Sequence, residues 1–358
     1  MVFLALLIAS AVGLALVLGR RREESLSTAG PLVVADPAAA TSKSVPSPAI
    51  APRDPAALAA LAATNAAVGE RLWRLGYAAS SAPAGSSERM DQLVRNNVAA
   101  ILQVDVIDHD FFPRRPALLP QLLQAIDDPR TASDKLARMI AHDPVLVGDV
   151  LRTANSPMYR TSSAPIESIQ RAIAVCGVDA LRAILAIAMV RPVFRATSKN
   201  FPRLPRVLWD RTERAARAAE LYAAAHLPQD RFECQLVVLL NALGPLVVHS
   251  ALLDVYARNP LFPPNAALCV ALTAELAPRM SQRIAWDWQT SRRLLAALEA
   301  SAVEPLTEVL LIGELLGTLS FLESQTVISP ETREEFLLAA TIPRASIDAI
   351  LPQLDKRA

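Results

Sequence analysis

The sequence has few of the residues that β-sheets and common enzyme motifs require. Aromatic residues make up 5% of the 358 residues, glycines number 11 and cysteines number 3. The glycines are isolated, so the chain has no glycine-rich phosphate loop, and it has no G-x-S-x-G nucleophile elbow. Cys176, Cys234 and Cys269 lack the paired spacing of a metal site. We expect them to be buried free thiols.

The sequence also lacks an excess of either charge. The net charge is +1, from 36 basic and 35 acidic residues. Such a balance provides no field that would attract nucleic acid, so we expect no nucleic-acid partner. Hydrophobic residues make up 52%, and alanine and leucine dominate them. Because these residues favour helices over sheets, the composition predicts an all-α protein.

The chain opens with an uncharged apolar stretch, residues 2–19. It reaches the length of a short membrane helix. Arg20, Arg21 and Arg22 follow at once, and no basic side chain precedes the stretch. This arrangement favours a retained anchor over a cleaved signal peptide, which is the alternative. By the positive-inside rule, the rest of the chain would face the cytoplasm.

Breaks in composition divide the rest of the chain. Asp54-Pro55 pairs a helix-capping side chain with a proline that suits a first helical turn, so we expect a helix to start there. The sequence leaves open whether residues 54–90 pack on the main domain. The expected segments are an anchor with its basic stop (1–22), a flexible Pro/Ala/Ser-rich linker (23–53), a helical extension (54–112), a multi-helix domain (113–322) and C-terminal helices (323–358).

Residues 141–157 carry the most distinctive local pattern. Asp143 can cap a new helix and Pro144 suits its first turn. Asn155 can take a left-handed conformation, and Ser156-Pro157 prevents the helix from continuing. Further on, we expect a helix that opens at Pro165 and closes at Gly177. Among the other helices that we expect are 208–225 with Trp209 in the core, 232–242 with a break at Gly244-Pro245, a resumed helix from 246 to 256, and 305–322.

Several short motifs together resemble the HDOD domain, a bacterial relative of the HD-type metal phosphohydrolases that generally lacks their metal site. The resemblance runs from about residue 118 to about residue 317. It rests on Leu119-Pro120, Asp143-Pro144, residues 151–156, residues 166–173 and Cys176-Gly177. It implies a helical domain related to the HD fold, a role in bacterial signal transduction and, with the anchor, a location at the bacterial inner membrane.

The resemblance also implies that the metal-ligand positions have been lost. HD-type hydrolases hold their metal with a first histidine and a His-Asp dyad. By this resemblance, Arg211 stands at the position of the first histidine, and Asn241 and Ala242 stand at the positions of the dyad. We therefore expect no metal, no cofactor and no catalysis. Asp108-His109-Asp110 and His142-Asp143 are weaker metal candidates, and each is better explained as loop or capping residues. We expect His226 and His249 to be ordinary helix-end residues.

Three functions remain open. The first is a scaffold that binds unknown signalling proteins, with a surface at Asn155, Ser156, Pro157, Met158 and Tyr159, although a structural role for this motif is favoured. The second is a degenerate nucleotide pocket that uses Arg211, Arg214 and Asn241. The third is a divergent phosphohydrolase. Arg211, Arg214 and Arg217 otherwise form a basic edge that we expect to be solvated.

Overall fold

The computed structural model describes residues 54–78, 88–103, 144–156, 164–190, 200–262, 264–299 and 304–355, together with short pieces between residues 111 and 141. All of them lie in one compact unit, Pro48–Ala358. The predicted anchor, the linker, Asp108-His109-Asp110, His142-Asp143 and residues 157–159 lie outside the described residues. In the described ranges every regular element is a helix, which confirms the all-α class.

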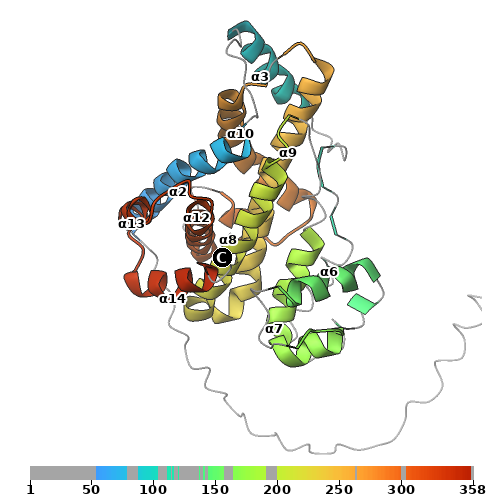
Figure 1. The fold of residues 1–358 in the computed structure, drawn as a ribbon, viewed down its shortest axis with the longest axis vertical. Coiled ribbons are helices and arrows are strands. Elements are labelled where there is room, and N and C mark those ends of the chain that lie inside the picture. Colours follow the sequence, from blue (N-terminus) through green and yellow to red (C-terminus); the bar gives the residue numbers. More distant parts are fainter. Residues whose placement is uncertain are drawn as a thin grey trace, which may run out of the picture. The chain divides into compact units, whose positions relative to one another are not determined.

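Figure 1 shows the described helices and their places along the chain. Their bounds are α2 Pro55–Gly76, α3 Glu88–Leu102, α6 Pro144–Ala154, α7 Ile169–Val190, α8 Leu204–His226, α9 Arg231–Arg258, α10 Ala266–Asp287, α11 Arg292–Ala297, α12 Pro305–Ser324, α13 Pro330–Ala339 and α14 Arg344–Asp355, with a 3-10 turn, η2, at Pro228–Asp230. Asp54 caps α2 as the sequence predicts, because its Oδ1 accepts from the Ala56 N–H at 3.2 Å.

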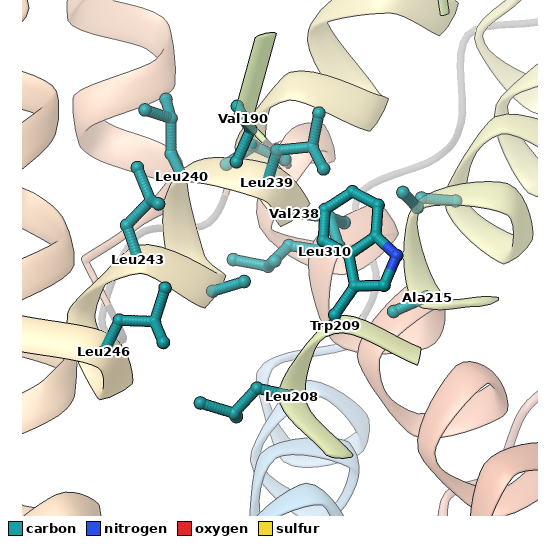
Figure 2. Close-up of a cluster of buried hydrophobic side chains, with 14 of the residues drawn as sticks. Val190, Leu208, Trp209, Ala215, Val238, Leu239, Leu240, Leu243, Leu246 and Leu310 are labelled. Carbon is teal, nitrogen blue, oxygen red and sulfur yellow. The ribbon is translucent and has the colours of Figure 1, made fainter. Parts of the chain in front are cut away.

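The core lies between α8, α9, α10 and α12. Helix α8 packs against α9 and α12, and α9 packs against α10. Figure 2 shows apolar side chains from α7, α8, α9 and α12 that gather in this core: Val190, Leu208, Trp209, Ala215, Val238, Leu239, Leu240, Leu243, Leu246 and Leu310. Trp209 is buried, as predicted. Each large apolar side chain that is withdrawn from water contributes about 1.5–3 kcal/mol to folding.

Small residues bring α8 and α12 unusually close together. A Cβ atom added at Gly317 would overlap the backbone of Ala215, and one added at Gly313 would overlap Ala219. Glycine is needed at both positions because only a residue without a side chain allows so close an approach. The same contact brings the preceding turn of α8, which carries Arg211, against Glu314 of α12.

The predicted break at Gly244-Pro245 is wrong, because α9 runs unbroken through it. Pro245 has no N–H, so the carbonyl of Asn241 loses its helical partner. The Ser281 hydroxyl of α10 donates to that carbonyl at 2.8 Å and replaces the missing bond. Gly244 permits this contact, since a Cβ there would overlap the backbone of α10 at Ala277. Because this donor comes from another helix, the local sequence around Pro245 could not predict it.

Helix α7 begins later than the sequence suggests. It starts at Ile169 and not at Pro165, and Ser168 Oγ accepts from the Arg171 N–H at 3.1 Å. The predicted stop at Gly177 is confirmed in the backbone, where φ is 81° and the helix is interrupted before it continues to Val190.

The N-terminal extension packs on the main domain, which settles the question that the sequence left open. Helix α2 contacts α8, α10, α12 and α13, and α3 contacts α9 and α10. Leu61, Val68 and Leu72 form the buried face of α2. The Asn65 side-chain amide donates to the Leu311 carbonyl of α12 at 2.9 Å. Figure 1 shows α2 beside α12.

Two helices in the described part are long and apolar enough to cross a membrane: η2 with α9, Pro228–Arg258, and α12, Pro305–Ser324. In each of them 83% of the 18-residue apolar stretch is buried inside the domain. Their apolar character is therefore explained by the core that they build.

Candidate functional site

Arg211 and Glu314 form a buried ion pair across the α8–α12 contact. Arg211 is only 3% exposed. The expectation of a solvated basic edge is wrong for this residue, because α12 covers this side of α8. A guanidinium carries a fixed positive charge, and burial requires a partner for it. Glu314 is that partner.

The next two arginines of α8 have other partners. Arg214 is also buried, which again contradicts a solvated edge, and its Nη1 donates to the Ser320 carbonyl at 2.7 Å and to Ser320 Oγ at 3.0 Å. Arg217 pairs with Glu220 at 2.7 Å, and Arg231 binds the same carboxylate at 2.9 Å. Arg214 therefore joins α8 to α12 and Arg231 joins α9 to α8, whereas the Arg217–Glu220 pair lies within α8.

A cavity of about 310 Å³ opens beside the Arg211–Glu314 pair. Helices α2, α8, α9, α10 and α12 wall it, with residues from the end of α11. Arg211, Asn241 and Glu314 all line it. The structure thus brings together two of the three residues of the predicted nucleotide pocket, Arg211 and Asn241, whereas Arg214 is not among the lining residues. Ala242 is fully buried and does not line the cavity.

Most polar groups on the cavity wall are already occupied. Thr273 Oγ1 and the Tyr77 hydroxyl lie 2.8 Å apart, and Thr307 Oγ1 donates to the Ala297 carbonyl at 3.3 Å. The Asn65 amide donates to α12, as described above. Asn241 differs, because the structure records no hydrogen bond of its side chain within the described residues; only its backbone carbonyl is bound, by Ser281.

Sequence reasoning missed Glu314, Asn65 and Thr273 as members of this site. The sequence did contain a feature that could have identified Glu314. It is a carboxylate inside the apolar stretch of α12, and a carboxylate on a buried helix requires a cation nearby. The identity of that cation, 103 residues earlier in the chain, carried no local signal. Asn65 and Thr273 come from helices whose placement no sequence pattern specified.

Asn155 joins the end of α6 to the following segment. Its Nδ2 donates to the carbonyls of Leu151 at 2.8 Å and Ile166 at 2.7 Å, and its Oδ1 accepts from the Ile166 N–H at 2.8 Å. It does not take the expected left-handed conformation, since the non-glycine residues with positive φ in the described part are Gln289, Thr326 and Thr341. The helix end is stabilised by the side chain instead.

His249 lies inside the protein and not at a helix end, which corrects the prediction. It sits within α9, is 1% exposed and lies near the rings of Tyr77 and Phe201, with centroids at 5.9 and 6.3 Å. Burial lowers the pKa of His249 to about 4. His226, in contrast, ends α8 as expected, and its ring packs on the ring of Tyr222 with the centroids 4.2 Å apart.

Two of the three cysteines are buried free thiols, as predicted. Burial raises the pKa of Cys234 and of Cys269 to about 12. Because the thiolate is the reactive form, neither thiol suits nucleophilic catalysis. The side chain of Cys176 lies outside the description.

The residues on the cavity wall do not fit a metal centre. Arg211 places a fixed cation where a ligand would be needed, and Asn241 offers an amide in place of imidazole. Across the described ranges, no group of three or more His, Cys, Asp or Glu residues is close enough to hold a metal ion.

Comparison with known proteins identifies the family. The HDOD domain matches residues 112–299, more than half of the chain, and the chain belongs to this family. Glu314 lies beyond the matched residues, and so does the whole of α2. No curated protein matches the chain.

Two solved structures are similar to this chain. A candidate metal-dependent phosphohydrolase from Shewanella amazonensis SB2B has 15% identity and a TM-score of 0.50, over 74% of this chain and 98% of that chain. An HDOD domain protein of unknown function from Geobacter sulfurreducens has 18% identity and a TM-score of 0.47, over 75% and 92%. At this identity the Shewanella protein indicates a shared fold and nothing about activity.

Proposed function

We propose that this protein is a non-catalytic signalling or scaffolding module of the bacterial inner membrane. Residues 2–19 would anchor it and the HDOD domain would lie in the cytoplasm. It would act by binding a signalling protein, or by changing its helix packing when a ligand binds. The observation that carries the proposal is the buried Arg211–Glu314 pair, which lies beside Asn241 in the cavity.

The chemistry of this pair supports binding over hydrolysis. A metal-dependent phosphohydrolase needs neutral imidazole and carboxylate ligands that converge on a metal, which then activates water. Here the carboxylate of Glu314 is engaged by the guanidinium of Arg211. A divalent cation at this place would face a fixed positive charge within the same wall, and Coulomb repulsion at such short range is strong in a low dielectric.

The partner surface that we propose remains at Asn155, Ser156, Pro157, Met158 and Tyr159. The hydrogen-bonding groups of the Asn155 amide are used inside the fold. Contacts with a signalling protein would therefore come from the other residues of this stretch. A cross-linking amino acid placed at Tyr159 of the full chain should capture a partner in cells, whereas the same group at the exposed Ala63 of α2 should not.

The test of the non-catalytic proposal is metal content together with activity. The full chain, purified from cells grown with added manganese, iron and zinc, should contain far less than one metal per chain by elemental mass spectrometry. It should also release no nitrophenol from bis(p-nitrophenyl) phosphate. One or two bound metals per chain with metal-dependent hydrolysis would overturn the proposal and favour the divergent phosphohydrolase.

A nucleotide is the second candidate ligand, because Arg211 and Asn241 line one cavity. Arginine binds phosphate well when its guanidinium is available. Glu314 already neutralises Arg211, which weakens this alternative. Cyclic dinucleotides should raise the thermal midpoint of the full chain if the alternative holds, and the absence of any shift would reject it.

A further inference from the structure

The cavity has a mainly apolar wall. Its lining includes Leu72 and Trp73 of α2, Pro245 of α9, Ala277 of α10 and Leu310 of α12. Its volume, about 310 Å³, lies at the lower end of the range of small-molecule sites. Such a wall gains free energy by covering apolar ligand surface and offers little to a strongly hydrated group.

The charge of the wall is balanced. Arg211 and Glu314 are the charged residues among those that line the cavity, and they are bound to each other. An anion entering the cavity would gain from Arg211 and lose to Glu314 at similar distances, while also losing its hydration. An uncharged ligand loses far less hydration. The electrostatics therefore select against phosphate and carboxylate groups.

The Asn241 side chain is an uncharged polar group on the wall that remains available. The Asn241 side chain is half-buried, lines the cavity, and has no hydrogen bond within the described residues. An amide has two N–H donors and a carbonyl acceptor. A polar group that loses contact with water without gaining a partner costs free energy, so a ligand that buries Asn241 is favoured if it supplies a matching group.

We propose that this cavity binds an uncharged, mainly apolar small molecule that carries one hydrogen-bonding group for the Asn241 amide. This inference rests on the proposed non-catalytic function, and it names the class of ligand that would change the helix packing. Helix α2 contributes Asn65, Gly69 and Trp73 to the wall. A bound ligand therefore adds contacts between α2 and the domain.

Two isosteric probes test the charge selection. 2-Naphthamide is neutral and carries an amide, whereas 2-naphthoate has nearly the same shape and a negative charge. Millimolar 2-naphthamide should raise the thermal midpoint of the full chain, and 2-naphthoate should not. An equal or larger rise with 2-naphthoate would overturn the proposal and favour an anion site. A failure of both probes to shift the midpoint would also overturn it.

Filling the cavity tests where the probe binds. In Gly69→Leu a leucine would occupy space beside Trp73, and a Cβ at this position meets only Trp73 Nε1, at an ordinary 3.7 Å. Leucine also favours helix over glycine, so this variant should fold. It should lose the response to 2-naphthamide. Ala63→Leu, on the exposed side of α2 and outside the cavity lining, should keep the response.

Two further variants complete the test. Ala274→Leu fills the cavity from α10 and should also abolish the response, which covers the case in which Gly69→Leu fails to fold. Asn241→Leu should weaken binding of 2-naphthamide by about tenfold, the value of one hydrogen bond. A response that persists in both filled variants would overturn the assignment of the site. None of these outcomes affects metal content or hydrolysis, so a failure here is distinguishable from a failure of the proposed function.

Discussion

The turn at Asn155 and the cavity at Arg211 both place polar side chains among apolar helices, but they use them differently. At the turn, one amide makes three hydrogen bonds to two neighbouring residues, Leu151 and Ile166. At the cavity, Arg211 and Glu314 bind each other while Arg211 Nε and Glu314 Oε1 have no hydrogen-bond partner within the described residues. Within the described part of the chain, the Asn241 side chain likewise has no hydrogen bond.

This difference separates structural polar groups from groups that suit binding. A polar side chain whose donors and acceptors are all used inside the fold stabilises that fold and has little left for a ligand. A polar group on a cavity wall with unused capacity carries a desolvation cost that a ligand can relieve. The comparison therefore assigns stability to Asn155 and recognition to the wall around Asn241.

The largest effect should follow from removing one partner of the buried pair. Glu314→Ala leaves Arg211 with an uncompensated buried charge, and this should lower the free energy of unfolding by about 3–5 kcal/mol. Denaturation of the full chain by urea measures this loss. A loss below about 1 kcal/mol would mean that the pair is more hydrated than its burial indicates.

The double variant Arg211→Met with Glu314→Leu is the matched control. It removes both charges and fills the same space with apolar side chains, which is often neutral or stabilising. We expect it to recover most of the stability that Glu314→Ala loses. If both variants lose the same amount, packing and not charge explains the effect.

His249 extends the comparison to a buried polar group in apolar surroundings. Its pKa is about 4 in the folded protein and near 6.5 in the unfolded chain. As the pH falls below 6.5, His249 becomes protonated in the unfolded chain but stays neutral in the folded protein. The free energy of unfolding therefore decreases until the pH reaches about 4. The total loss should be about 3 kcal/mol. His249→Phe should lack this component, and the stability difference between the two proteins across pH 4–7.5 measures it. A constant difference would contradict the burial effect.

Asn155→Ala should have a smaller effect, a loss of about 2 kcal/mol, because it leaves the Leu151 and Ile166 groups without their partner. Asn155→Asp keeps the acceptor for the Ile166 N–H but loses both donors, so it should not restore stability. Urea denaturation measures both variants. Neither should alter the response to 2-naphthamide. A changed response at unchanged stability would reverse our assignment of roles.

Local signals were enough for the helix starts and stops. Asp54 and Gly177 act through capping and backbone freedom within a few residues, and these features are readable from the sequence. The resemblance pointed to Arg211 and Asn241, and the structure places both on one cavity wall. The site was therefore half-predictable, through the positions where the HD ligands would stand.

The sequence did not allow us to predict which residues far apart in the chain contact each other. The pairing of Arg211 with Glu314 depends on the small residues that bring α8 against α12, and no pattern within either helix specifies the other. The burial of His249 depends likewise on Tyr77 and Phe201, which come from other parts of the chain. Tertiary packing decided these features after secondary structure was fixed.

The smallest predicted effect concerns the continuity of α9 through Pro245, the feature that the sequence misjudged most clearly. Ser281→Ala removes the hydroxyl that donates to the Asn241 carbonyl, so it should cost about 1 kcal/mol of unfolding free energy. In a Pro245→Ala background the restored backbone N–H can bind that carbonyl, and the same Ser281→Ala change should then cost little. A double-mutant cycle by urea denaturation measures this coupling. Additive losses would show that the Ser281 hydroxyl acts mainly through its second contact, the Ala277 carbonyl at 3.2 Å, and that the proline is tolerated without a replacement donor.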